Sequence, residues 1–156
     1  MDLVYLAPAY SDFTSRSANS IHIMRMCEAF VENGHKVTLI IFSRGERKQE
    51  ILENYGIEVR FEILQIQISS NTGGKILYPL LASKTARSIQ PDLVVGRSTE
   101  ACALTALKGM PTVYDVHKPV WKKPREFLFY LSFFRSRNLL RMTTNSQALK
   151  EIYEKA

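Results

Sequence analysis

Short apolar segments rich in β-branched and aromatic residues alternate along this chain with longer amphipathic segments. The short segments predict strands over residues 2–8, 37–43, 57–68, 92–97, 111–116 and 141–145. The amphipathic segments predict helices over 20–33, 45–55, 76–89, 98–108, 124–139 and 146–155. Regular alternation of this kind restricts a chain to α/β folds. The sequence therefore predicts a doubly wound α/β domain, with a mostly parallel sheet of about six strands and helices on both faces.

The apolar content of each segment indicates its place in the sheet. Residues 37–42 and 93–95 are almost continuously apolar, which is typical of central strands. Residues 57–68 alternate, which suits a strand near an edge or one that bends. Residues 69–75 form the one Ser/Gly-rich stretch and are expected to be a mobile loop rather than a domain linker. We therefore expect residues 1–156 to form a single domain.

In open parallel sheets, ligands bind beyond the carboxyl ends of the strands, where the strand order reverses. The first loop of this crevice, after the first strand, lacks the glycines of a dinucleotide fingerprint, so NAD and FAD are not expected. A P-loop is also disfavoured, because Gly73-Gly74-Lys75 lacks the earlier glycine and the following Ser/Thr. The first loop instead offers hydroxyl and amide groups before a helix N-terminus, which suits an anion, although a solvated capping loop explains them equally well.

Two histidines are candidates for this crevice. His117 ends the fifth strand, where an imidazole could exchange a proton or hydrogen-bond a sugar hydroxyl. His22 lies in the first turn of a helix, off its apolar stripe. Asp115 is expected to point away from His117 and to orient a neighbouring loop. Cys27 and Cys102 lie in apolar helical patterns and are expected to be buried, without a disulfide or a thiolate metal site.

Positive charge is concentrated in one segment. The chain has 21 Lys and Arg against 15 Asp and Glu, and residues 118–141 account for the whole excess of six. A nucleic-acid binder would spread its cations over a face, so nucleic acid is not an expected partner. The same segment is rich in Phe and Leu, which allows two interpretations. Lys122, Lys123 and Arg125 could contact an anionic membrane surface, or the apolar residues could be core and the cations solvated.

The N-terminus runs directly from Met1 into an apolar strand, so no signal peptide is expected and a cytoplasmic location is predicted. The most apolar run, residues 127–134, is much shorter than the roughly 20 residues that span a bilayer. Peripheral attachment to the inner face of a membrane remains compatible with the sequence.

Four segments together resemble the N-terminal domain of GT-B glycosyltransferases of family 4, the group 1 retaining type. They are residues 17–40, 91–99, 109–119 and 143–156, which read SANSIHIMRMCEAFVENGHKVTLI, PDLVVGRST, GMPTVYDVHKP and TTNSQALKEIYEKA. They occur in the family's order and cover most of the chain. The resemblance implies a Rossmann-like domain that forms one half of a two-domain enzyme, which transfers sugar from a nucleotide-sugar donor without a metal ion.

The resemblance also implies roles for particular residues. His117 would be the catalytic histidine, near the acceptor and the transferred sugar. Residues on the side of the donor phosphates would be Ser17, Ala18, Asn19, Ser20 and His22. Residues of the acceptor cleft would be Tyr10, Ser15, Arg16, Arg97, Ser98 and Lys118. Many family members have a Gly-Gly pair where this chain has residues 17–20, which makes close approach of that backbone to phosphate less secure.

Two functions from different classes remain open at this point. One is the acceptor-side domain of a glycosyltransferase, which is inactive without a C-terminal nucleotide-sugar domain and takes a sugar, a lipid-linked or another hydroxyl acceptor. The other is a non-catalytic module of the same fold that binds a membrane or a protein partner.

Overall fold

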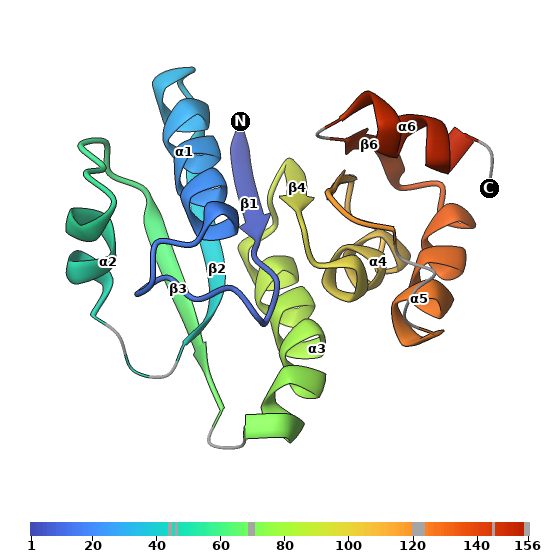
Figure 1. Ribbon diagram of the computed structural model, residues 1–156, viewed down its shortest axis with the longest axis horizontal. Helices are drawn as coiled ribbons and strands as arrows, with labels where there is room; N and C mark the ends of the chain where they lie inside the picture. The colour runs from blue at the N-terminus through green and yellow to red at the C-terminus, as the bar shows by residue number, and fades with distance from the viewer. Residues whose placement is uncertain (44, 46, 69–70, 120–123, 145, 155–156) are drawn as a thin grey trace.

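Six parallel strands form one sheet in the computed structural model, which describes residues 1–43, 45, 47–68, 71–119, 124–144 and 146–154 (Figure 1). The strands are β1 (Asp2–Leu6), β2 (Lys36–Ser43), β3 (Glu62–Gln67), β4 (Leu93–Gly96), β5 (Thr112–Val116) and β6 (Leu139–Thr144). The helices are α1 (Ala18–Glu32), α2 (Lys48–Asn54), α3 (Asn71–Ile89), α4 (Thr99–Leu107), α5 (Pro124–Phe134) and α6 (Gln147–Glu154). Their alternation confirms the predicted fold class.

The strand order β3-β2-β1-β4-β5-β6 places β1 at the centre. It places β3 at one edge, as the alternating pattern of residues 57–68 predicted. Each of the five strand pairs is parallel. The chain leaves β1 toward β2 and later returns beside β1 with β4, so the strand order reverses there. A crevice therefore opens beyond the carboxyl ends of β1 and β4, which is where this topology places ligands.

Two hydrophobic cores cover the two faces of the sheet. Tyr5 of β1 packs on one face with Ile23 and Cys27 of α1, together with Ile51 of α2. The opposite face holds residues of α3, α4, α5 and α6, and includes Cys102. Both cysteines are buried thiols without a disulfide. Because β1 is buried on both faces, its residues 3–6 are all apolar or aromatic.

Three predicted boundaries differ from the structure by about five residues. The strand predicted over 57–68 begins only at Glu62, because residues 57–61 are irregular and their apolar side chains join the core that also holds Ile51 of α2. The helix predicted over 124–139 ends at Phe134. The loop predicted over 69–75 is helical from Asn71 onward, as part of α3, and residues 69 and 70 lie outside the described chain.

Packing explains the early start of α3. A Cβ atom on Gly74 would meet Ile68 and Phe42 at 3.3 Å, so the glycine lets the first turns of the helix approach the end of the sheet. Tyr78 then anchors the helix, because its hydroxyl donates to the carbonyl groups of Ala7 (2.8 Å) and Ile40 (2.9 Å). Glycine is unfavourable inside a helix by about 1 kcal/mol, but this tertiary packing outweighs that local preference.

Gly96 ends β4 where the backbone passes very close to its neighbours. A Cβ atom there would lie 2.8 Å from the Leu6 carbonyl oxygen and 2.9 Å from the Cys102 sulfur. Gly96→Ala is therefore expected to lower the free energy of unfolding by about 1–3 kcal/mol, because the two strands must separate. Urea unfolding of the wild type and the variant measures this difference. Superimposable curves would show that the strands yield without cost.

Candidate functional site

A buried ion pair joins the carboxyl ends of β4 and β5. The Arg97 side chain is 5% exposed, and its Nε lies 2.8 Å from Asp115 Oδ2. The two residues are the next inward-facing positions after Val95 and Val113 on the face of the sheet that α1 covers. The pair is held by charge, since the Arg97 Nε–H does not form a well-aligned hydrogen bond with the carboxylate.

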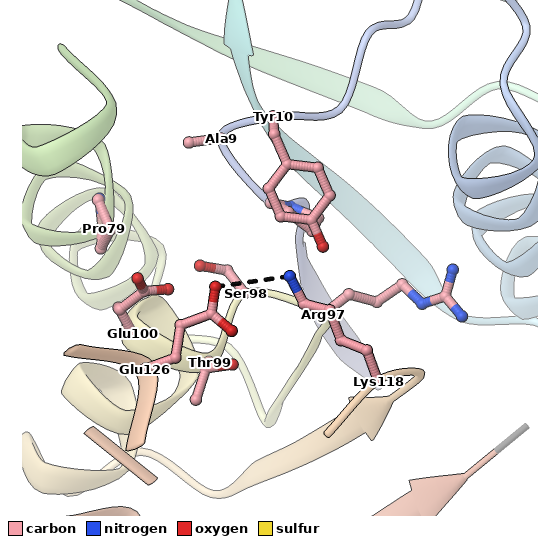
Figure 2. Close-up of a pocket in the computed structure, with 10 residues that line it drawn as sticks. Ala9, Tyr10, Pro79, Arg97, Ser98, Thr99, Glu100, Lys118 and Glu126 are labelled. Atoms are coloured by element: carbon pink, nitrogen blue, oxygen red, sulfur yellow. Dashed lines mark hydrogen bonds and ion pairs between the residues drawn. The ribbon is translucent and has the colours of Figure 1, made fainter. Parts of the chain in front are cut away.

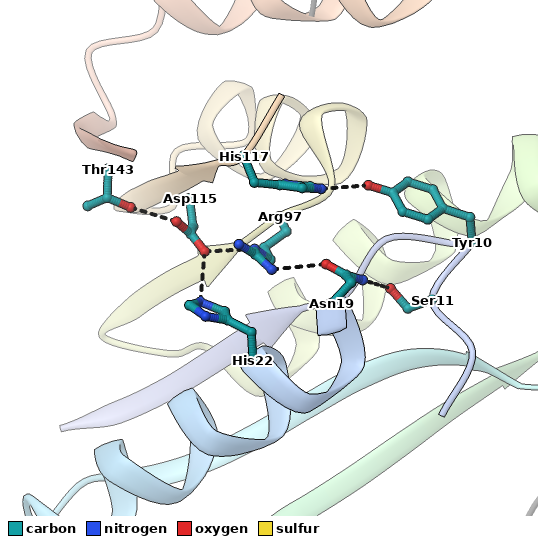
Figure 3. Close-up of polar contacts among 8 residues, drawn as sticks. All are labelled: Tyr10, Ser11, Asn19, His22, Arg97, Asp115, His117 and Thr143. Carbon is teal, nitrogen blue, oxygen red and sulfur yellow. Dashed lines mark hydrogen bonds and ion pairs between the residues drawn. The ribbon is translucent and has the colours of Figure 1, made fainter. Parts of the chain in front are cut away.

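Polar contacts extend from this pair in both directions (Figure 3). On one side, the Thr143 hydroxyl of β6 donates to Asp115 Oδ1 at 3.1 Å. On the other side, Arg97 Nη1 donates to Asn19 Oδ1 at 3.0 Å. The Asn19 amide in turn donates to the Ser11 hydroxyl in the first loop at 2.7 Å. The network therefore fixes β6, β5, β4, α1 and the first loop relative to one another.

His22 of α1 also faces this network. Its Nε2 lies 3.4 Å from Asp115 Oδ2, so the side chain points toward the crevice, as predicted. His22, Arg97 and Asp115 thus meet as polar and charged groups in a largely buried place. The Tyr5 hydroxyl is buried beside them and has no hydrogen-bond partner among the described residues. A concentration of buried polar side chains at the end of a sheet marks a candidate functional site.

His117 lies directly after β5, beside this cluster. Its Nε2 is 3.2 Å from the Tyr10 hydroxyl of the first loop. Partial burial, together with the positive charges of Arg97 and Lys118, lowers the pKa of His117 to about 4. The imidazole is therefore neutral at physiological pH. The neutral ring can donate a hydrogen bond to a hydroxyl group or accept one from it, but it does not add a positive charge to the crevice.

The structure corrects the expectation for Asp115. In a strand, residues two positions apart point to the same face, so Asp115 and His117 share a side of the sheet. The Asp115 carboxylate lies at the centre of the network, 2.8 Å from Arg97, rather than turned away from it (Figure 3). Asp115 thus holds together side chains from β4, β6 and α1 at the floor of the crevice.

A cavity of about 230 Å³ opens beside the end of β5 (Figure 2). His117 is not among its lining residues, but its hydrogen-bond partner Tyr10 and the next residue, Lys118, are. Tyr10, Pro79, Glu100, Lys118 and Glu126 are among its lining residues, so the first loop and helices α3, α4 and α5 all contribute to it. The Lys118 ammonium lies 3.5 Å from Glu126 Oε1 and 4.6 Å from the centre of the Tyr10 ring. The cavity combines a mostly apolar lining with carboxylate, ammonium and aromatic groups, which is the usual composition of a small-molecule site.

Four of the six residues expected in the acceptor cleft line the cavity, and two do not. Tyr10, Arg97, Ser98 and Lys118 all line the cavity. The Arg97 guanidinium points away from the α3 side of the cavity, where Pro79 lies. Ser98 is also the N-cap of α4, and its hydroxyl accepts a hydrogen bond from the Ala101 amide. Ser15 and Arg16 are exposed further along the first loop and are not among the lining residues. Arg16 has a φ of 49°, a left-handed conformation that is uncommon for a residue with a side chain.

The residues expected on the side of the donor phosphates lie at the start of α1. Ser17 is the N-cap, and its hydroxyl accepts from the Ser20 amide at 3.2 Å. Ser20 is fully buried, and its hydroxyl accepts from Tyr55 at 2.7 Å. Ala18 is exposed, and Asn19 is held by Arg97. The serine hydroxyls therefore serve the local structure, while the helix N-terminus itself borders the crevice.

The basic segment falls partly outside the described chain. Lys122 and Lys123 lie outside the described residues, and nothing is described of the Arg125 side chain. Some apolar residues of α5 are part of the core, as one interpretation of this segment predicts, and others are exposed, as the membrane-contact interpretation requires. Tyr130 is 8% exposed and belongs to the core, whereas Phe127, Leu128 and Leu131 are 36%, 64% and 44% exposed.

Sequence reasoning missed two contributors to the site. Thr143 donates to Asp115 from β6, a contact that depends on the register of two strands. Glu126 is only 8% exposed and faces Lys118 across the cavity. Its position as the lone acid in a basic segment was the available signal.

No described helix is long and apolar enough to cross a bilayer. Within the described residues, no group of His, Cys, Asp or Glu side chains could hold a metal ion.

The lowered pKa of His117 makes stability depend on pH. The unfolded chain binds a proton at this histidine near pH 6.5, whereas the folded chain does so only near pH 4. Falling pH therefore favours unfolding across this interval. Because His117 is only half-buried, we expect the wild type to lose about 1–2 kcal/mol more than His117→Gln between neutral pH and pH 4.5.

Urea unfolding at several pH values measures this difference, and His35→Gln, in a turn distant from the crevice, is the matched control. Equal pH dependence for the wild type and His117→Gln would show that the folded protein does not resist protonation of His117.

Comparison with known proteins supports the predicted fold and identifies the family. A family model, Glycosyltransferase Family 4, matches residues 20–156. Among solved structures, the chain is similar to MurG of Acinetobacter baumannii, with a TM-score of 0.50 and 14% sequence identity over 74% of this chain. The match covers 34% of the MurG chain, so this chain spans about a third of that length. No curated protein matches the sequence. The likeness to MurG confirms the predicted fold, one half of a GT-B architecture.

Proposed function

Because this chain belongs to Glycosyltransferase Family 4, we propose that it is the acceptor-side domain of an enzyme that transfers a sugar from a nucleotide-sugar to an acceptor hydroxyl. The observation that carries this proposal is the position of the neutral His117 imidazole. It lies at the carboxyl end of the sheet, 3.2 Å from the Tyr10 hydroxyl, beside a cavity lined by carboxylate and aromatic side chains.

His117 is proposed to be the catalytic residue that contacts the reacting sugar. Its pKa of about 4 makes it a weak base, so its contribution is a hydrogen bond to a hydroxyl of the transferred sugar or the acceptor. A neutral partner suits this position, because a sugar ring that loses its leaving group develops positive charge. The buried Arg97–Asp115 pair positions the end of β5 and thereby His117.

The donor is proposed to reach the crevice from the α1 side. The N-terminus of α1, residues 17–22, would face the donor diphosphate, since backbone amides and the helix dipole stabilise negative charge there. We propose retention at the anomeric carbon, without a metal ion, as the family implies. A C-terminal domain would hold most of the nucleotide-sugar, so this chain is proposed to be inactive alone. We propose that the reaction takes place in the cytoplasm, with a sugar, a lipid-linked or another hydroxyl acceptor.

Reconstitution tests this function. The chain is assayed for sugar transfer from a panel of nucleotide-sugars, alone and joined to the C-terminal domain of a family 4 enzyme. Transfer only by the joined protein, with retained anomeric configuration in the product, is the expected result. Failure of every joined protein that folds and binds a nucleotide-sugar would contradict the proposal, and transfer by this chain alone would contradict its dependence on a second domain.

A further inference from the structure

The chain leaves the sheet after β5 in a turn that has little backbone support of its own. His117 and Lys118 directly follow Val116, the last residue of β5, and the chain bends at Lys118. Among the described residues, none forms a backbone–backbone hydrogen bond with residues 117–119, and Pro119 has no amide hydrogen to donate. The position of the His117 imidazole therefore depends on side chains that reach this turn from other elements.

One of these side chains contacts the backbone of the turn. The Tyr153 hydroxyl of α6 donates to the Lys118 carbonyl oxygen at 3.0 Å. On the other side of His117, Val116 pairs with Thr144 in the sheet. Only the φ and ψ angles of His117 and Lys118 separate these two fixed points of the backbone. The hydroxyl of Tyr153 therefore limits the directions in which the imidazole can move.

The ring of Tyr153 is itself held in place by packing. Its centroid lies 5.6 Å from that of the buried Tyr130 of α5, in a tilted arrangement. Leu149 and Tyr153 are four residues apart and lie on the same face of α6, which packs against the core. The core thus fixes the ring, and with it the position of the hydroxyl that reaches the turn.

The side chains of the turn connect this contact to the cavity. The Lys118 ammonium lies 3.5 Å from Glu126 Oε1 and 4.6 Å from the centre of the Tyr10 ring (Figure 2). The Tyr10 hydroxyl in turn lies 3.2 Å from His117 Nε2 (Figure 3). A displacement of the Lys118 backbone would therefore disturb both the histidine and a residue that lines the cavity.

We propose that Tyr153 is a positioning residue for His117, which it holds beside the cavity through the backbone of the turn. Tyr153 acts through the Lys118 carbonyl and does not contact the reacting groups. Without its hydroxyl, the turn should loosen, so that the imidazole becomes better hydrated and shifts relative to the reacting hydroxyl. This role rests on the catalytic function proposed for His117, but the state of the imidazole can be measured without sugar transfer.

An NMR titration of the imidazole resonances in the 156-residue chain measures that state. Burial is the main cause of the lowered pKa of His117. Tyr153→Phe keeps the ring and removes only the hydroxyl, so it should raise the pKa of His117 from about 4 toward 6.5. The titratable and charged groups that face the imidazole are unchanged in this variant: Tyr10, His22, Arg97, Asp115 and Lys118.

Thr105→Val is the matched control. It also removes one buried hydroxyl, which donates to the Cys102 carbonyl oxygen at 2.8 Å and lies beside Thr112, at the opposite end of β5. The pKa of His117 should not change in this variant. In the joined, two-domain protein, Tyr153→Phe should lower kcat about 10-fold, since a displacement of about 1 Å can cost 10²-fold. Thr105→Val should leave kcat as in the wild type.

Circular dichroism and urea unfolding check that both variants fold. The proposal is overturned if folded Tyr153→Phe keeps the wild-type pKa of His117, or if Thr105→Val raises that pKa equally, because the hydroxyl would then serve only stability. A raised pKa with unchanged kcat also overturns it. If no joined protein transfers sugar, the proposed function fails, whereas the titration still decides whether Tyr153 positions His117.

Discussion

Arg97→Met is expected to lower the free energy of unfolding by about 3–5 kcal/mol, the cost of leaving one member of a buried ion pair without its partner. The Asp115 carboxylate is 13% exposed and, among the described residues, would keep Thr143 and His22 as its polar neighbours. Asn19 would also lose the donor that fixes its side chain. In a chain of this length, the loss corresponds to a fall in melting temperature of roughly 10–15 °C. Urea and thermal unfolding both measure it.

Two further variants separate the loss of charge pairing from a general effect of truncation. Arg97→Met/Asp115→Leu removes both charges and should recover part of the stability, since no buried charge is then left alone. Arg25→Met removes a 53%-exposed side chain that is paired with Glu28 and should cost less than about 1 kcal/mol. If Arg97→Met costs no more than Arg25→Met, the buried pair does not stabilise the crevice.

His117→Ala is expected to reduce kcat of the complete, two-domain enzyme by about 10²-fold or more, the usual effect of removing one positioned hydrogen-bond group from a reacting centre. Stability at neutral pH should change much less, because the half-buried imidazole contacts Tyr10 at the edge of the crevice rather than in either core. Steady-state kinetics and urea unfolding of the same preparations measure the two effects.

Tyr10→Phe is the informative companion to this variant. It removes the hydroxyl that lies 3.2 Å from His117 Nε2 but leaves the imidazole in place. We expect it to reduce kcat less than His117→Ala does. Near-wild-type kinetics for His117→Ala would exclude that residue from the mechanism, whereas a matching loss of stability and activity would assign it a structural role.

The sequence predicted the order and type of the elements because hydrophobic periodicity is a local property. All six strands and six helices were expected near their observed positions, and the edge position of β3 followed from its alternating pattern. The start of α3 was missed because it depends on packing between Gly74 and two residues distant in sequence, Ile68 in the preceding segment and Phe42 in β2. Local composition there favoured a loop.

The site was predictable where one residue type at a strand end carries the signal, as for His117 and Arg97. It was not predictable where several elements have to meet. The role of Asp115 depends on the side of β5 that it faces and on the register of β5 with β6, which brings Thr143 beside it. The contact of Tyr153 with the Lys118 carbonyl was also hidden, because it joins residues 35 positions apart in the sequence.

The polar network that joins β6, β5, β4, α1 and the first loop also constrains how the protein folds. Its contacts link residues separated by 107, 78 and 28 positions in the sequence, such as Tyr10 with His117, Asn19 with Arg97, and Asp115 with Thr143. None of these contacts can form until both of its residues have been synthesised. During synthesis on the ribosome, β1, β2 and β4 can pair before Asp115 has emerged. At that stage Arg97 has no carboxylate of Asp115 with which to form its ion pair. The crevice is therefore the part of the domain that completes last, when β5 and then β6 join the sheet.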